Sequence, residues 1–126
     1  MRKLITLTVG CWLLCLSLLV QAAWYEGGTL HAASAVEWQQ ASDANKLATS
    51  ADLFTVMWQN DHLKPSISQQ VNTVDDLRRF AEELMTQLND AFSPDADAAE
   101  NARLFTNQQV GETSVLLMFM MGWVKE

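Results

Sequence analysis

The feature that most restricts the fold is a repeat of apolar residues between Thr73 and Ala91. Apolar side chains recur there at steps of three and four, the spacing that places them on one face of an α-helix. The repeat comprises Leu77, Phe80, Ala81, Leu84, Leu88 and Ala91. Thr73 and Asp76 form a capping box at its start. The pattern therefore predicts a long amphipathic helix that buries one face against other parts of the chain.

The rest of the chain favours helix as well. Only five glycines and two prolines occur in 126 residues, so few positions interrupt a helix. No run of alternating apolar and polar β-branched residues predicts a strand. Further helix starts are predicted at Ser34, with Glu37 in a capping box, at Ser42 or Asp43, at Ser93 before Pro94, and at Thr106, with Gln109 in another capping box. We therefore expect an all-α fold, a small bundle of four to five helices.

The final predicted helix, from about Asn107 to Trp123, has a different character. Every residue from Val115 to Met121 is apolar, so this part of the helix lacks a polar face. A helix of that kind lies in the middle of a bundle or in contact with a partner. We therefore expect this apolar C-terminal helix at the centre of the bundle, with a homo-oligomer formed through it as the alternative.

The first 22 residues have the three parts of a secretory signal peptide. Two basic residues precede an uncharged apolar run from Leu4 to Val20, and Val20 and Ala22 supply the small or aliphatic residues at positions −3 and −1 of a cut after Ala22. We predict cleavage after Ala22 or Ala23, which leaves a single helical domain, residues 23–126, in the periplasm. An N-terminal segment that stays uncleaved and anchors the protein is the alternative, although the apolar run is short for a membrane span.

Cleavage also changes the composition. Both cysteines and two of the eight lysines and arginines lie in the predicted signal peptide, which leaves six cations, fifteen acids and a formal charge of −9. The chain that remains after cleavage has no cysteine, which excludes disulfides, thiol catalysis and zinc–thiolate sites. An acidic chain lacks the basic surface that nucleic acids and anionic membranes require. We therefore expect no nucleic-acid partner and no membrane span after cleavage.

No pattern in the sequence predicts a catalytic or metal site. The two histidines, His31 and His62, lie in no zinc-binding motif, and the chain has no GxSxG elbow. The acidic stretch from Asp90 to Glu100 lacks the glycine of a calcium loop. We therefore predict a protein that is not an enzyme and holds no cofactor or metal. A hydrolase that uses both histidines is the most remote alternative.

Aromatic residues and a double glycine near the predicted new N-terminus are the candidate contacts to a ligand or partner. Aromatic side chains with a polar rim mark interfaces, and adjacent glycines let a backbone approach a ligand closely. The candidates are Trp24, Tyr25, Gly27, Gly28, Thr29, His31 and Trp38. The structural alternative is an N-terminal tail that packs across a groove of the bundle.

These features lead to two main hypotheses. In the first, the exported protein binds a protein or peptide partner through its tryptophans or its apolar final helix. In the second, it carries a small ligand or metal with the Gly27–His31 region, His62 and the methionines, because thioethers bind copper in oxidising compartments.

A set of short exported bacterial proteins of unknown function resembles this chain in the segments Gly27–His31, Glu37–Trp38 and Asn45–Thr49. The tryptophan at position 123, after a methionine and a glycine, is similar as well. This resemblance implies export and carries no activity, fold or ligand. In size and helicity the chain is also similar to small acid-stress chaperones of the periplasm, which usually carry a disulfide that this chain lacks. A chaperone-like stress protein is therefore a further alternative.

Overall fold

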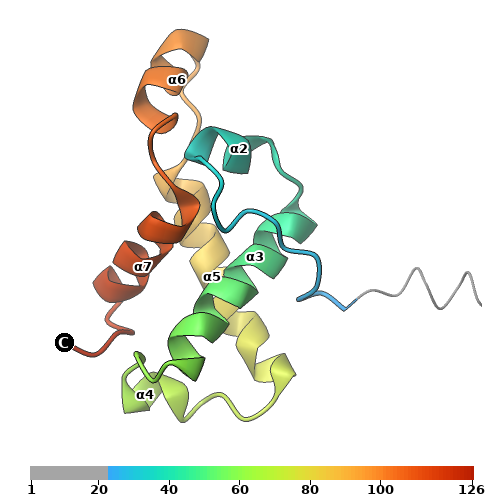
Figure 1. The fold of residues 1–126 in the computed structure, drawn as a ribbon, viewed down its shortest axis with the longest axis vertical. Helices are drawn as coiled ribbons and strands as arrows, with labels where there is room; N and C mark the ends of the chain where they lie inside the picture. Colours follow the sequence, from blue (N-terminus) through green and yellow to red (C-terminus); the bar gives the residue numbers. More distant parts are fainter. Residues whose placement is uncertain (1–22) are drawn as a thin grey trace, which may run out of the picture.

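The computed structural model describes residues 23–126, and the predicted signal peptide lies outside the described residues. Within that range the chain forms six helices and no strand (Figure 1). They are α2 (Ala35–Gln40), α3 (Asp43–Gln59), α4 (Pro65–Ser68), α5 (Val74–Ala91), α6 (Ala98–Phe105) and α7 (Val110–Met120). The all-α prediction is confirmed. The additional helix is the one-turn α4, which starts at a proline because proline is already fixed in a helical φ.

Helices α3 and α5 pack against each other and form the centre of the fold. The predicted stripe of α5 is buried from Leu77 to Leu88, whereas its last member, Ala91, is exposed. On α3 the buried face ends with Phe54 and Met57. The three- and four-residue spacing of the apolar residues also predicts Trp58 on the buried face of α3 with Phe54. This prediction is wrong, because Trp58 lies one position past Met57, toward the solvent side of the helix, and is 37% exposed.

The predicted starts of α2, α3 and α5 agree with the structure. Capping boxes form at Ser34 before α2 and at Thr73 before α5. Ser42 caps α3, and its hydroxyl accepts a hydrogen bond from the backbone N–H of Asn45 at 3.2 Å. These caps are local, since each joins residues three apart along the chain.

The predicted start of the next helix is wrong, because α6 begins after Asp97 and not after Ser93. Side chains hold the intervening residues in a turn. The backbone N–H of Asp95 donates to Oδ1 of Asn101 at 3.0 Å, and the N–H of Asp97 donates to Oδ1 of Asp95 at 2.8 Å. Such side-chain bonds compete with helix formation.

Helix α7 also begins later than predicted, after Gln109 and not after Thr106. Residues 108–110 pair instead with residues 33–35, through two backbone hydrogen bonds of 2.8 and 3.0 Å. Thr106 belongs to the end of α6. The segment before α2 and the start of α7 are thus held side by side, although more than seventy residues separate them in the sequence.

The apolar C-terminal helix is not at the centre of the bundle. Helix α7 packs against α5 and α3 with one side only, through Val110, Ser114 and Met118, and its other side is exposed (Figure 1). The prediction is wrong because the apolar sequence covers every side of the helix, while a helix that lies on a two-helix centre is contacted from one side.

The core is completed from the C-terminal end of the chain by Trp123. The rings of Phe54 and Phe80 stack with centroids 4.9 Å apart, and the Trp123 ring meets them edge-on at 5.7 and 5.4 Å. Two backbone hydrogen bonds, of 2.8 and 2.9 Å, tie residues 123–125 to residues 62–64, in the segment between α3 and α4. The C-terminal segment is therefore anchored on the same α3–α5 centre as α7.

Candidate functional site

The N-terminal segment lies on α3 and is bound to it by the side chains of Asn45 and Thr49. The backbone N–H of Thr29 donates to Asn45 Oδ1 at 2.9 Å, and Asn45 Nδ2 donates to Thr29 Oγ1 at 2.8 Å. The N–H of Leu30 donates to Oγ1 of Thr49, a fully buried residue, at 3.2 Å. The segments Gly27–His31 and Asn45–Thr49 therefore meet in one polar contact. This contact supplies acceptors for the backbone N–H groups of Thr29 and Leu30.

The double glycine is required by this packing. A Cβ atom at Gly28 would lie 2.6 Å from the backbone nitrogen of Thr49 and 2.9 Å from the carbonyl carbon of Ala48. Gly27 has a φ of 86°, in the left-handed region that other residues rarely adopt. The space beside Gly28 is thus filled by the backbone of α3, and the close approach predicted for a ligand is made by the protein itself.

His31 forms a surface pair with Asp52 of α3. Its Nε2 lies 2.8 Å from Asp52 Oδ2, and the two side chains are 43% and 44% exposed. His62 lies beyond the end of α3 and is exposed, so the structure does not bring the two histidines together. Among residues 23–126, no three His, Cys, Asp or Glu side chains gather in a way that would hold a metal ion.

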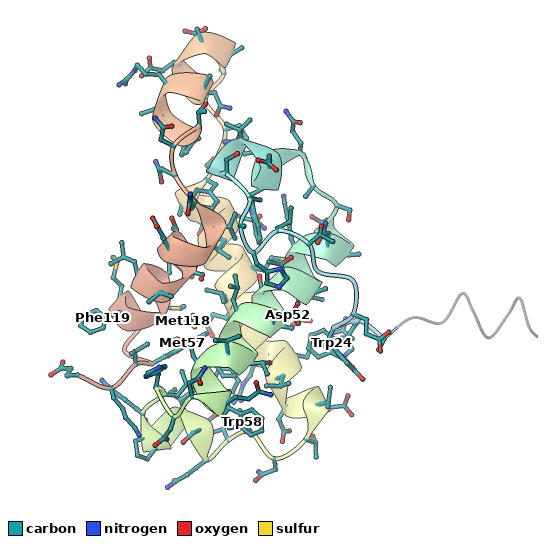
Figure 2. The ribbon with its side chains drawn as sticks, viewed as in Figure 1. Trp24, Asp52, Met57, Trp58, Met118 and Phe119 are labelled. Atoms are coloured by element: carbon teal, nitrogen blue, oxygen red, sulfur yellow. The ribbon has the colours of Figure 1, made fainter. Side chains whose placement is uncertain are left out.

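The aromatic candidates have different environments. Trp38 is 1% exposed, and its Nε1 donates to Asn89 Oδ1 at 3.0 Å, so it belongs to the core. Trp24 is half-buried, with the Arg78 guanidinium 5.5 Å from its ring centroid. It meets Tyr25 edge-on at 5.5 Å, and Tyr25 is 37% exposed. The tail therefore packs on the bundle, with Trp24 in the position labelled in Figure 2. Of the three candidates only Trp24 and Tyr25 keep aromatic surface in solvent.

An open depression of about 440 Å³ lies between this tail and the start of α3. Its lining residues are Ala23, Trp24, Glu26, Gly27, Ser42, Ala44 and Asn45. Two of its polar side chains already have partners, because Ser42 caps α3 and Asn45 binds Thr29. An aromatic wall and the carboxylate of Glu26 are what this depression offers to a small ligand.

The pKa of the Asp76 carboxyl group is lowered, which indicates a structural role. It accepts backbone hydrogen bonds from Asn72 at 2.9 Å and Thr73 at 3.0 Å, and these bonds lower the pKa of Asp76 below its usual 3.8. A carboxyl that acts as a general acid needs a raised pKa. Asp76 thus serves as the ionised cap of α5.

Large apolar side chains of α7 are exposed together on the side of the helix that faces away from the bundle. They are Val115 (47% exposed), Leu116 (58%), Phe119 (51%) and Met120 (71%). Their spacing places them on one side of a helix, and we call this set the α7 apolar face. Figure 2 shows Phe119 at the outer edge of the molecule, whereas Met118 is fully buried. The sequence from Thr113 to Val124 contains no charged residue.

Small residues mark the inner side of α7. Ser114 is fully buried, and a Cβ atom at Gly111 would lie 2.8 Å from the carbonyl oxygen of His31. Together with Val110 and Met118, Ser114 defines a contact side with a four-residue spacing. The sequence did not predict this orientation, because every residue from Val115 to Met121 is apolar. The four-residue spacing of the buried positions therefore does not stand out from the exposed positions between them.

The methionines of the described residues have three kinds of environment. Met57 and Met118 are buried in the core, Met85 and Met121 are partly buried against it, and Met120 is exposed. This distribution is that of core filling and surface contact. Among residues 23–126, no helix has the length and apolar character needed to cross a membrane.

Comparisons with protein-family models, with curated proteins and with solved structures give no match for this chain. The resemblance to short exported bacterial proteins stays a prediction. A proposal about function therefore rests on the geometry of the described residues.

Proposed function

We propose that the mature chain is a non-catalytic binding protein of the periplasm and that the α7 apolar face contacts a protein or peptide partner. One observation carries this proposal: four large apolar side chains are exposed together on a strongly acidic chain. Soluble monomers seldom expose contiguous apolar patches larger than a few hundred Å², and such patches mark interaction sites.

Covering this face supplies part of a binding free energy. Full burial of a side chain of this size is worth about 1.5–3 kcal/mol. These side chains are already about half buried, so each contributes roughly 1 kcal/mol. Association itself costs roughly 4–15 kcal/mol. The face alone therefore supports a weak or transient complex, and polar contacts at its edge have to add affinity.

Photo-crosslinking tests whether the α7 apolar face meets a partner. A photoreactive amino acid is placed at Leu116 or Met120 in the exported protein. The matched control position is Val74, which is 45% exposed at the start of α5. We expect the same protein adduct from both α7 positions and none from Val74. No adduct from α7, or equal adducts from all three positions, contradicts the proposal. Many different adducts from α7 favour the chaperone-like alternative.

Export is part of the proposal and has its own measurement. Mass spectrometry of the intact protein from the periplasmic fraction is expected to give a chain that begins at Ala23 or Trp24. A full-length chain in the membrane fraction favours the uncleaved anchor.

The depression beside Trp24 favours a second candidate function, the carriage of a small ligand, because it combines an aromatic ring with a carboxylate at Glu26. Thermal unfolding of the purified protein with copper, zinc, haem and common periplasmic solutes tests this candidate. A midpoint that moves with none of them removes it.

A further inference from the structure

We infer that Met120 is a site of reversible oxidation by peroxides, and that its sulfoxide weakens binding by the α7 apolar face without unfolding the protein. The inference rests on the proposed function, to which it adds a form of regulation. Three observations carry it: the sulfur-containing residues of the chain, the exposure of the methionines, and the place of Met120 on the face.

Methionine is the only sulfur-containing residue in the described part of the chain. Both cysteines lie in the predicted signal peptide, and all of the six methionines except Met1 lie within residues 23–126. A reactive cysteine thiolate would compete for an oxidant. Without one, the thioethers are the sulfur groups that a peroxide can oxidise in the mature chain.

Exposure separates one of these methionines from the others. Met120 is 71% exposed, the highest value among the large apolar side chains of residues 23–126. Met118 is fully buried and Met57 is 8% exposed. Met85 and Met121 are partly buried against the core. Because oxidation follows the access of the oxidant to sulfur, we expect Met120 to react first.

The oxidation itself needs no other group of the protein. A lone pair of the Met120 sulfur attacks one oxygen of hydrogen peroxide, so that a sulfur–oxygen bond forms and the oxygen–oxygen bond breaks. The departing hydroxide takes the proton of the transferred hydroxyl group and leaves as water. The sulfur is thereby oxidised to the sulfoxide, the peroxide is reduced, and methionine sulfoxide reductases can reverse the change.

The sulfoxide changes the character of the α7 apolar face. Met120 is the most exposed of its four side chains and follows Leu116 by one helical turn, so the two lie next to each other. Oxidation replaces an apolar thioether by a polar group. A partner that covers this group without a hydrogen bond loses binding free energy. Oxidation of one atom therefore weakens the contact that the proposed function requires.

The fold does not depend on the same side chain. Met120 is the last residue of α7 and belongs to the side that faces away from the bundle. The methionines that fill the core, Met57 and Met118, are shielded from the oxidant by their burial. A mild oxidation thus changes the surface of α7 and leaves the packing of α7 on α5 as it is.

Peroxide treatment of the purified mature protein tests the site. Peptide mapping by mass spectrometry follows the sulfoxide at each methionine with time. We expect Met120 to be oxidised at least about tenfold faster than Met118, and faster than every other methionine. Equal rates at Met120 and Met121, or earlier reaction of a core methionine, overturn the inference.

Two variants assign the surface change to one sulfur atom. Met120→Leu keeps an apolar side chain of similar volume that peroxide does not oxidise, and the matched control Met121→Leu removes the neighbouring thioether. Retention on a hydrophobic-interaction column reports the exposed apolar surface. Mild peroxide treatment should shorten the retention of the unchanged protein and of Met121→Leu, but not that of Met120→Leu. Equal shifts in both variants, or a loss of the helical circular dichroism signal, contradict the inference.

The photo-crosslink from position 116 connects the oxidation with the proposed function. The labelled protein is treated with peroxide, freed of it, and mixed with periplasmic extract. We expect oxidation to lower the yield of the protein adduct about tenfold, a methionine sulfoxide reductase to restore it, and Met120→Leu to be insensitive to peroxide. If oxidised protein gives the same adduct in equal yield, the proposed function stands and this inference fails. If untreated protein gives no adduct, both fail.

Discussion

The Gly27–His31 segment and the α7 apolar face are both unusual in sequence, but the first packs on the protein and the second is exposed to solvent. The segment satisfies its backbone groups on Asn45 and Thr49 and packs a glycine directly on α3. The α7 helix, in contrast, leaves four large apolar side chains in solvent. The segment was predicted to contact a ligand and the helix to fill the centre. The comparison teaches that a sequence motif can serve packing within the protein when its backbone groups find their hydrogen-bond partners there. An apolar helix is buried only on the side that neighbouring helices contact.

Replacement of Trp38 tests the N-terminal side of this comparison with the largest expected effect. Trp38→Ala should lower the free energy of unfolding by about 3–5 kcal/mol, because it empties a fully buried site and removes the donor to Asn89. Urea denaturation measures the loss. The control Trp24→Ala removes a half-buried ring and should cost less. If Trp38→Ala costs no more than Trp24→Ala, Trp38 is not the core residue described above.

A substitution at Gly28 tests the close packing on α3. Gly28→Ala should cost about 1–3 kcal/mol, because its methyl group meets the backbone of Thr49 at 2.6 Å. Gly27→Ala is the comparison, since it meets no atom within 4 Å but has a positive φ, and should cost about 1 kcal/mol. Thermal or urea unfolding of both variants measures the two losses in the free energy of unfolding. A stable Gly28→Ala protein would leave that position free for a ligand.

The hydroxyl of Thr49 tests the polar contact between the two motifs. Thr49→Val keeps the shape but removes the acceptor of the Leu30 N–H, and should cost about 1–2 kcal/mol. Thr86→Val is the control, because its exposed hydroxyl donates only to the carbonyl of Glu82 in the same helix. The control should change stability by less than about 0.5 kcal/mol. Equal losses would show that the contact does not hold the segment.

The α7 apolar face should show the smallest effect on stability. Leu116→Ser and Met120→Ser should each lower the free energy of unfolding by no more than about 1 kcal/mol, because 58% and 71% of these side chains are exposed. Met118→Ser, on the inner side of the same helix, should cost about 2–5 kcal/mol. The same denaturation measurement compares them. A large loss from either exposed position would mean that the face is covered within the monomer.

The parts of the fold that could be predicted from the sequence depend on neighbours close in the chain. The stripe of α5 is decided by its own period, and the caps at Ser34, Ser42 and Thr73 join residues three apart. The starts of α6 and α7 could not be predicted in this way. They depend on a turn held by the Asn101 side chain and on the pairing of residues 33–35 with residues 108–110.

The candidate site was harder to predict for a related reason. The double glycine and Thr29 stand out in the sequence, but their role depends on α3, some twenty residues further along. Trp38 was predicted as a contact because aromatic residues serve interfaces and cores alike, and only its burial separates the two. The sequence of α7 does not show which side of the helix faces solvent. The one indication is that the small residues Gly111 and Ser114 lie on the inner side.

The position of Trp123 in the aromatic cluster has a consequence for the timing of folding. A chain that is synthesised from its N-terminus presents Phe54 and Phe80 long before Trp123. The stacked pair then lacks its third ring, and residues 62–64 lack their partners, until the C-terminal segment arrives. The core therefore closes only when nearly the whole chain has emerged.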